Sequence, residues 1–282
     1  MSVKKVLTKK HAAAFAQYLH KEERAPATAE KYLRDIRQFA AWLDSGEVSK
    51  EAVAKWKTYL LSKNYNPSTI NGKLAALNGL FRFLGWEDCR VKFLKIQRRM
   101  FRDSSRDLTQ RDYAILTAVA RERNQERLAL LIETICSTGI RVSEVKYITV
   151  ECVRQGRAEI SLKGKLRTIL LPSKLCRKLL KYIKKVHILS GEIFLTGNGK
   201  SLSRRQIWAE MKALCKYADI EPSKVFPHNL RHLFATTFYR VCRDIVKLAD
   251  MLGHSSIETT RIYLLTSGTE HQRQLDRLGL IS

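Results

Sequence analysis

The segment 226–263 places the strongest constraint on the fold and chemistry of this chain, because it contains several polar side chains that packing in a hydrophobic core does not explain. A proline opens it and suits the first turn of a helix, where no N–H donor is needed. His228, Arg231 and His232 then stand at positions i, i+3 and i+4, so they share one face near an anion-favouring helix N-terminus. The pattern predicts a basic helical face, which by itself also fits an ordinary solvated helix.

The second half of the segment predicts two more short helices. The first would end at Gly253, in the left-handed conformation that terminates helices, with His254 in the following turn. Ser255 and Glu258 form a capping-box pattern for the next helix, and Tyr263 lies about two turns along it. Imidazoles, a guanidinium and a phenol are groups that a protein would converge on a phosphodiester.

The net charge points to a densely negative partner. The chain carries 52 basic and 27 acidic residues, a formal net charge of +25. Up to Gln97 there are 18 basic and 9 acidic residues, and 34 and 18 after it, so both parts are strongly positive. We therefore expect nucleic acid as the partner, ahead of an anionic membrane.

Other protein classes fit poorly. The six cysteines show no metal-binding spacing, so we expect buried thiols in a reducing compartment and neither zinc nor disulfides. No stretch approaches the roughly 20 apolar residues of a transmembrane helix, and the N-terminus lacks a signal-peptide core. The expectation is a cytoplasmic protein without a membrane partner, and no domain is expected before Thr8.

Residues 1–97 read as a compact bundle of four short helices. Apolar residues at helical spacing predict helices at about 8–21 and 69–84. Between them, Thr28 is the expected cap of the second helix and Ser49 of the third. Basic residues interleave with the apolar stripes and are expected outside, where they would grip phosphates: Lys31, Arg34, Lys55, Lys57, Lys63 and Lys73.

Residues 98–107 are polar, basic and without periodicity, which predicts an interdomain linker. Its arginines favour a segment that lies along a polyanion over a passive tether. We expect Arg98, Arg99 and Arg102 to contact DNA.

Residues 108–282 predict a second, α+β domain. Thr109 is the expected cap of its first helix, and the apolar helix over 126–137 is expected at the centre of the core. Two strand-like runs around Lys163 predict a small β-hairpin with a cationic tip. Further helices are expected at about 173–187, capped by Ser173, at 204–217 and at 270–278.

Taken together, these pieces resemble the tyrosine recombinase family of phage-integrase type. The family's T-G-x-R-x-S-E motif is matched by the segment ending in Arg141, Val142, Ser143 and Glu144. Its H-x-L-R-H box is matched at 228–232, and its L-G-H box is followed nine residues later by Tyr263. Its lysine-bearing hairpin is matched by Lys163-Gly164, although this hairpin is one residue shorter than the commonest version, so Lys165 stays an alternative to Lys163.

The resemblance implies a role for each matched residue. Tyr263 would attack a DNA phosphate and form a 3′-phosphotyrosyl link, while Arg141 and Arg231 hold the non-bridging oxygens. Lys163 would protonate the leaving 5′-oxygen. The remaining roles are a general base or phosphate ligand at His228, a hydrogen bond to the phosphate from His254, an orienting contact from Glu144, and DNA contacts from Lys165, Arg167 and His232.

The resemblance also implies an assembly. The fold would be mainly α with a small β-hairpin, a SAM-like core-binding domain and a catalytic domain forming a clamp around DNA. The partner would be double-stranded DNA with inverted repeats, bound by a dimer per site and a homo-tetramer on two sites, without metal or cofactor, in a prokaryotic nucleoid. Integration, excision, inversion and resolution stay open. The alternatives are relaxation of DNA by a type IB topoisomerase and a non-catalytic DNA-binding protein.

Overall fold

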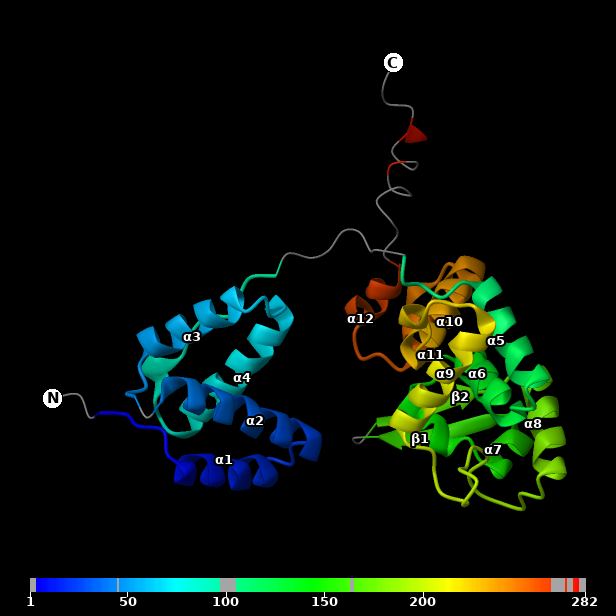
Figure 1. The fold of residues 1–282 in the computed structure, drawn as a ribbon, viewed down its shortest axis with the longest axis horizontal. Coiled ribbons are helices and arrows are strands. Elements are labelled where there is room, and N and C mark those ends of the chain that lie inside the picture. The colour runs from blue at the N-terminus through cyan, green and yellow to red at the C-terminus, as the bar shows by residue number, and fades with distance from the viewer. Residues whose placement is uncertain are drawn as a thin grey trace. The chain divides into compact units, whose positions relative to one another are not determined.

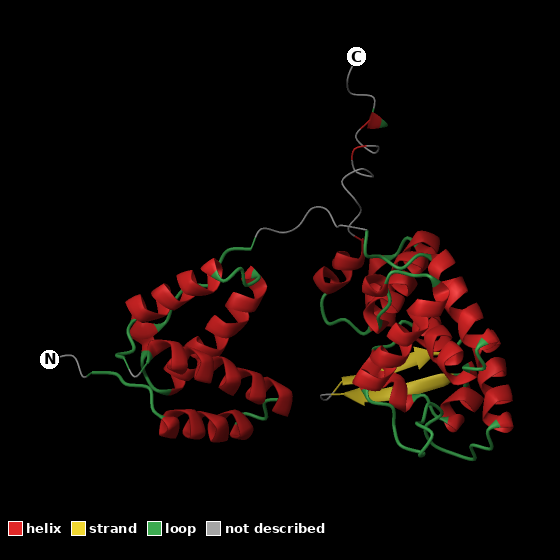
Figure 2. Ribbon diagram, in the orientation of Figure 1, coloured by secondary structure: helices red, strands yellow, loops and turns green. Residues whose placement is uncertain are grey.

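The computed structural model describes residues 4–44, 46–96, 105–162, 165–264, 272 and 276–278. Two compact units make up the chain, Met1–Arg98 and Arg99–Ser282 (Figure 1). Helices dominate both, and the two strands lie in the second unit (Figure 2). The predicted fold class, mainly α with one small β-hairpin, is confirmed. The arginines Arg98, Arg99 and Arg102 lie outside the described residues, so the linker and its DNA contacts stay predictions.

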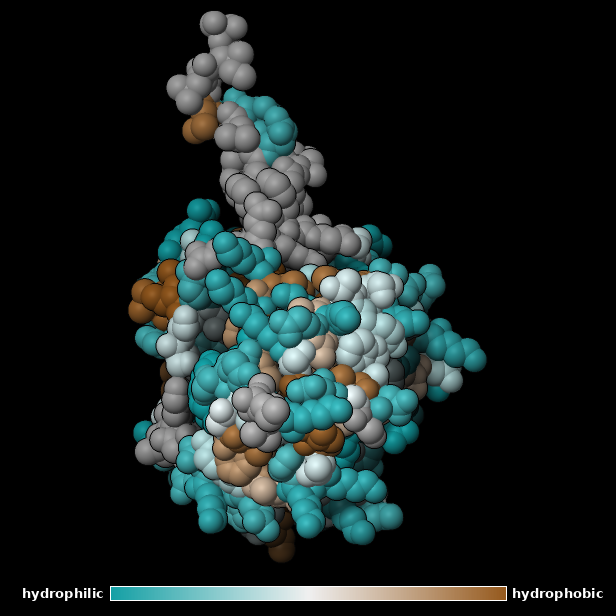
Figure 3. Space-filling view, turned by 90° about the vertical axis from the view of Figure 1, so that its left-hand side faces the viewer, coloured by the Kyte–Doolittle hydropathy of each residue, from teal (hydrophilic) through white to brown (hydrophobic). Residues whose placement is uncertain are grey.

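The first unit contains the four expected helices, followed by a 3-10 turn at Glu87–Cys89. Large aromatic side chains fill its centre, where the Trp56 ring meets Phe39 edge-on with centroids 5.1 Å apart. Hydrophilic residues cover most of the face visible in Figure 3. The helices are α1 (Lys9–Lys21), α2 (Pro26–Leu43), α3 (Lys50–Ser62) and α4 (Pro67–Phe83).

The starts of these helices follow local chemistry. The Ser49 side chain accepts a hydrogen bond from the Ala52 N–H, so it caps α3 as predicted. Thr28 does not cap α2, because Pro26 occupies the first helical turn and starts the helix two residues earlier. The fourth helix likewise starts earlier than expected, at a proline capped by Asn66.

Lys73 is not on the outside of this unit. Its side chain is buried, and its Nζ lies 3.2 Å from Asp35 Oδ1 and also bonds Gln38. A lysine so enclosed needs a carboxylate, which α2 supplies across the α2–α4 packing. The expected contact of Lys73 with DNA is therefore wrong.

The second unit packs its helices around α6 (Glu126–Thr138), which is buried along most of its length, as the sequence predicts. Thr109 caps α5 (Gln110–Glu122) through a reciprocal capping box with Asp112. Contacts join α6 to α5, α8 and α10. The remaining helices are α7 (Val150–Gln155), α8 (Ser173–Lys185), α9 (Arg204–Ala218), α10 (Pro227–Cys242), α11 (Ile245–Leu252) and α12 (Ile257–Arg261).

The predicted hairpin is present. Strands β1 (Arg157–Leu162) and β2 (Lys165–Leu170) pair antiparallel, with Ile160 opposite Arg167 and Leu162 opposite Lys165. Its tip, residues 163–164, lies outside the described residues, as do the side chains of 161–166. The choice between Lys163 and Lys165 therefore stays open.

Three local expectations are corrected or lie outside the described chain. Ser173 is the first residue of α8 and not its cap, because Pro172 holds the cap position. Ser256, not Ser255, occupies the cap position of α12, and no side chain caps that helix. Most of the expected helix over 270–278 is outside the described residues.

The six cysteines are free thiols; three are buried and Cys242 is exposed. In the part of the chain that the structure describes, no helix has the length and apolarity needed to cross a bilayer.

Candidate active site

The end of α6 sets the position of the first arginine. Gly139 adopts a left-handed conformation with φ of 64°, and a Cβ there would overlap the Phe234 ring. Only glycine satisfies both conditions, so the chain turns sharply after α6. Arg141 then precedes a 3-10 turn (Val142–Tyr147), and its backbone N–H donates to Glu144 Oε2 over 2.8 Å.

The second arginine comes from α10. Pro227 occupies its first turn, as predicted, and Arg231 lies one turn further along and is 3% exposed. Its guanidinium donates to the Gly139 carbonyl and, over 2.7 Å, to the Leu252 carbonyl. Burial lowers the pKa of Arg231, and a hydrogen bond with the Tyr263 side chain opposes that shift.

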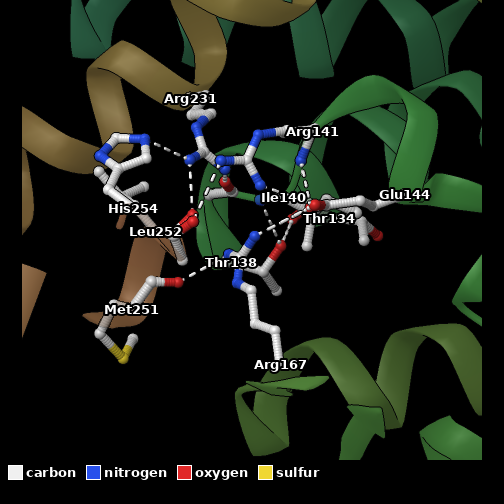
Figure 4. A network of polar contacts seen from close by, with 12 residues as sticks. Thr134, Thr138, Ile140, Arg141, Glu144, Arg167, Arg231, Met251, Leu252 and His254 are labelled. Atoms are coloured by element: carbon white, nitrogen blue, oxygen red, sulfur yellow. Dashed lines mark hydrogen bonds and ion pairs between the residues drawn. The ribbon is translucent and has the colours of Figure 1, made fainter. Parts of the chain in front are cut away.

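The end of α11 gathers three arginines (Figure 4). The carbonyls of Met251, Leu252 and Gly253 accept hydrogen bonds from Arg167, Arg231 and Arg141, over 2.7, 2.7 and 3.3 Å. Carbonyls at a helix C-terminus carry partial negative charge, so they suit cationic donors. The three guanidiniums are thereby assembled by backbone groups, and Gly253 ends the helix with φ of 62°, as predicted.

Glu144 is the anion of this cluster. Its side chain is 2% exposed and bonds Arg141 Nη1 over 2.9 Å and Arg167 Nη1 over 3.0 Å. Three guanidiniums against one carboxylate leave the described cluster cationic. Arg141 keeps 43% of its side chain exposed, so it offers its charge to an incoming anion.

His254 is held between Arg231 and Thr260. Its Nε2 lies 2.9 Å from Arg231 Nη2, and its Nδ1 lies 2.8 Å from Thr260 Oγ1. Because a guanidinium can only donate, Nε2 accepts, and Nδ1 carries the proton in the neutral ring. Burial, followed by the nearby arginines, lowers the pKa of His254 to about 4, which agrees with a neutral imidazole. Sequence reasoning missed Thr260, which is fully buried.

Tyr263 lies among three imidazoles. Its ring is 6% exposed, and its centroid lies 5.6 Å from His228, 5.4 Å from His232 and 5.8 Å from His254, which it stacks upon. It follows α12 in a 3-10 turn (Ile262–Leu264).

The structure thus brings together Arg141, Glu144, Arg231, His254 and Tyr263, with His228 at their edge. Two residues expected on the DNA surface lie elsewhere: the Arg167 side chain is only 10% exposed, and His232 is 5% exposed. Most of the Arg167 side chain is enclosed, and Glu144, distant in sequence, supplies its counter-charge.

Comparison with known proteins agrees with this geometry. Residues 106–268 match the phage integrase family, and residues 12–88 match the N-terminal SAM-like domain of phage integrases. The chain is 28% identical over 269 residues to the tyrosine recombinase XerA of Thermococcus kodakarensis, covering 92% of each protein. It is 27% identical to the tyrosine recombinase XerD of Vibrio cholerae, covering 89% of each.

Solved structures share the fold at low identity. A XerH site-specific recombinase bound to its difH substrate aligns over 97% of this chain and 90% of its own, with a TM-score of 0.69 and 17% identity. A lambda integrase tetramer bound to a Holliday junction aligns over 93% of this chain and 78% of its own, with a TM-score of 0.73 and 17% identity. The match to the phage integrase family spans more than half of the chain and includes every residue of the cluster described above, so this protein belongs to that family and is a tyrosine-type site-specific DNA recombinase.

Proposed function

We propose that Tyr263 is the nucleophile that cuts DNA, and that the chain rejoins strands through a 3′-phosphotyrosyl intermediate. The observation that carries this proposal is the position of the Tyr263 phenol beside the buried Arg231 guanidinium and three imidazoles. The Tyr263 oxygen must lose its proton as it bonds to phosphorus, so it needs a group beside it that accepts this proton.

Arg141 and Arg231 bind the two non-bridging oxygens of the scissile phosphate in this proposal. Each already donates one bond to the α11 end, so its planar fork is oriented before it meets a ligand. Negative charge grows on these oxygens in the transition state, where preorganised guanidiniums stabilise it. Glu144 orients Arg141 by binding both its side chain and its backbone N–H.

Two protons move in the proposed cleavage step: the phenol of Tyr263 loses one, and the leaving 5′-oxygen gains one. His228 lies near Tyr263 and takes the phenol proton as general base. Lys163 gives a proton to the leaving 5′-oxygen, with Lys165 as the alternative donor. His254 Nε2 accepts from Arg231, so His254 acts by holding Arg231, and donating to the phosphate directly would require that contact to open.

The proposed substrate is double-stranded DNA carrying inverted repeats, bound by one dimer per site and by a tetramer on two sites. The strongly positive charge of both parts of the chain supports a DNA partner. Related structures hold DNA, including the lambda integrase tetramer on a Holliday junction. The 98–107 segment would join a DNA-binding 1–97 domain to the catalytic 108–282 domain.

Trapping the covalent intermediate tests this proposal. Candidate sites are inverted repeats flanking the gene, prepared with a nick beside the cleavage position so that the released strand diffuses away. We expect a protein–DNA adduct that survives denaturation, with a nucleotide attached to the tryptic peptide 262–273, which contains Tyr263.

The Tyr263→Phe variant should form no adduct, since it lacks the attacking oxygen. Tyr239→Phe is the matched control, because Tyr239 packs in the same apolar cluster and should retain activity. An adduct formed by Tyr263→Phe would refute the assignment, and relaxation of supercoils without exchange between two sites would favour a topoisomerase instead.

A further inference from the structure

Arg167 is the third arginine of the cluster, and its ion pair and hydrogen bonds are all to other groups of the protein. Its Nη1 lies 3.0 and 3.3 Å from the two Glu144 carboxylate oxygens, and its Nη2 donates to the Met251 carbonyl over 2.7 Å. Arg167 belongs to β2, and its side chain, only 10% exposed, reaches from that strand to the end of α11.

The Arg167 side chain also fills the space beside Gly253. A Cβ on residue 253 would overlap the Arg167 Cδ and lie 2.8 Å from its Nε. The glycine therefore provides both the left-handed turn and the room for this side chain. The turn that presents His254 is packed directly against Arg167.

Arg167 also lies in the middle of the hairpin ladder. It pairs with Ile160 across the two strands, two pairs away from Leu162–Lys165, the last described pair of the hairpin. Ile160 and Ile169 are buried at 1% and 3% exposure, so the hairpin is anchored on the core at this level. Arg167 is the charged side chain that ties this anchored part to α11.

The charge of Arg167 persists at neutral pH. Burial lowers its pKa to about 10, and Glu144 opposes that shift. A guanidinium with that pKa is almost wholly protonated at pH 7, so Arg167 keeps its positive charge under physiological conditions.

We propose that Arg167 is a positioning residue for strand cleavage: it ties the hairpin that carries Lys163 to the turn that carries His254, and shares Glu144 with Arg141. This inference rests on the proposed function. It assigns Arg167 no contact with DNA.

Arg167 in this role has a specific effect on the leaving group. In the cleavage step, the Tyr263 oxygen bonds to phosphorus, the bond from phosphorus to the 5′-oxygen breaks, and Lys163 delivers a proton to that oxygen. When Arg167 is replaced, the hairpin keeps its apolar anchor but loses its tie to the end of α11, so the proton donor is misplaced relative to that turn. A 5′-bridging sulfur leaves as a thiolate, with a pKa of roughly 8.5 for a thiol, and needs no such proton.

Single-turnover cleavage on oxygen-bridged and sulfur-bridged nicked sites tests the inference with the full-length chain. We expect Arg167→Met to cleave the oxygen substrate about 100-fold more slowly than the unaltered chain, as for a reacting group displaced by about 1 Å. On the sulfur substrate the deficit should shrink to less than about tenfold. Arg157→Met is the matched control on the same hairpin, because its side chain is 59% exposed, and it should stay within about twofold on both substrates.

Several results would overturn the inference. Wild-type rates for Arg167→Met, or equal losses on the two substrates, would remove the link to the proton donor. If Arg167→Met binds DNA more weakly, and the slope of its log affinity against log salt concentration falls by about one, Arg167 is a phosphate contact. If Arg167→Met does not fold, Arg167→Lys keeps the charge without the fork, and must show the same selective rescue by sulfur. Failure of the unaltered chain to form a Tyr263 adduct would instead refute the proposed function.

Discussion

Replacing Glu144 tests how the cationic cluster is held together. Three contacts of 2.8 to 3.0 Å join its carboxylate to the Arg141 N–H, the Arg141 guanidinium and the Arg167 guanidinium. Glu144→Ala removes the anion and leaves a buried guanidinium without its counter-charge. Breaking a buried pair from one side costs about 3–5 kcal/mol, so we expect the free energy of unfolding of the second unit to fall by that amount.

Glu144→Gln separates charge from shape. The amide keeps one acceptor oxygen and similar volume, so it retains a hydrogen bond but not the ion pairs. We expect a smaller loss, about 2 kcal/mol, in line with the removal of a charge-assisted bond. Cleavage should fall by about 100-fold in both variants, since Arg141 loses the ion pair that orients its guanidinium.

Hydrogen exchange of the full-length chain measures this effect in the right unit. Peptides from α6 report global opening there, because that helix is buried along most of its length. Glu159→Ala is the matched control, with a side chain 65% exposed and an expected change within about 0.5 kcal/mol. If Glu144→Ala opens with the free energy of the unaltered chain, the carboxylate does not hold the cluster together.

Three further predictions concern stability. The pKa of His254 is lowered to about 4 by burial and then by the nearby arginines. The contribution of the neutral ring to the free energy of unfolding is therefore complete above pH 6.5 and is lost as the pH falls towards 4. Between these pH values, the free energy of unfolding of His254→Gln should fall less steeply with decreasing pH than that of the unaltered chain. Lys73→Met should destabilise the first unit by about 3 kcal/mol in urea, because it leaves a buried carboxylate with a single, more distant lysine, while the salt dependence of DNA binding stays unchanged. Gly139→Ala should cost about 3 kcal/mol through backbone strain and overlap with Phe234, whereas Gly156→Ala, with φ of 73° and open space, should cost about 1 kcal/mol; equal shifts in the urea midpoint would contradict the overlap.

Local rules in the sequence predicted the elements whose cause is local. Pro227 at a first helical turn, Ser49 as a cap and Gly253 as a terminator each depend on a few neighbouring residues, and each is as expected. The two adjacent serines before α12 show the limit of such rules, since either one suits the cap position.

Burial of charged residues could not be predicted in this way. Lys73 and Arg167 look like surface cations in the sequence, because their carboxylate partners lie 38 and 23 positions away. Helical and strand periodicity says nothing about which charges meet between elements. The cluster of Arg141, Arg231, His254 and Tyr263 could be predicted only from the combination of motifs, because the family resemblance indicates which distant residues meet in the fold.

The carbonyls at the end of α11 bear on how such a sequence can diverge. Arg167, Arg231 and Arg141 hold the main chain of residues 251–253 and not its side chains. Substitutions at Met251 therefore leave its bond to Arg167 intact wherever the helix end keeps its path. The side chain at position 251 can therefore change without loss of the arginine contact, whereas position 253 cannot, because any Cβ there would overlap Arg167.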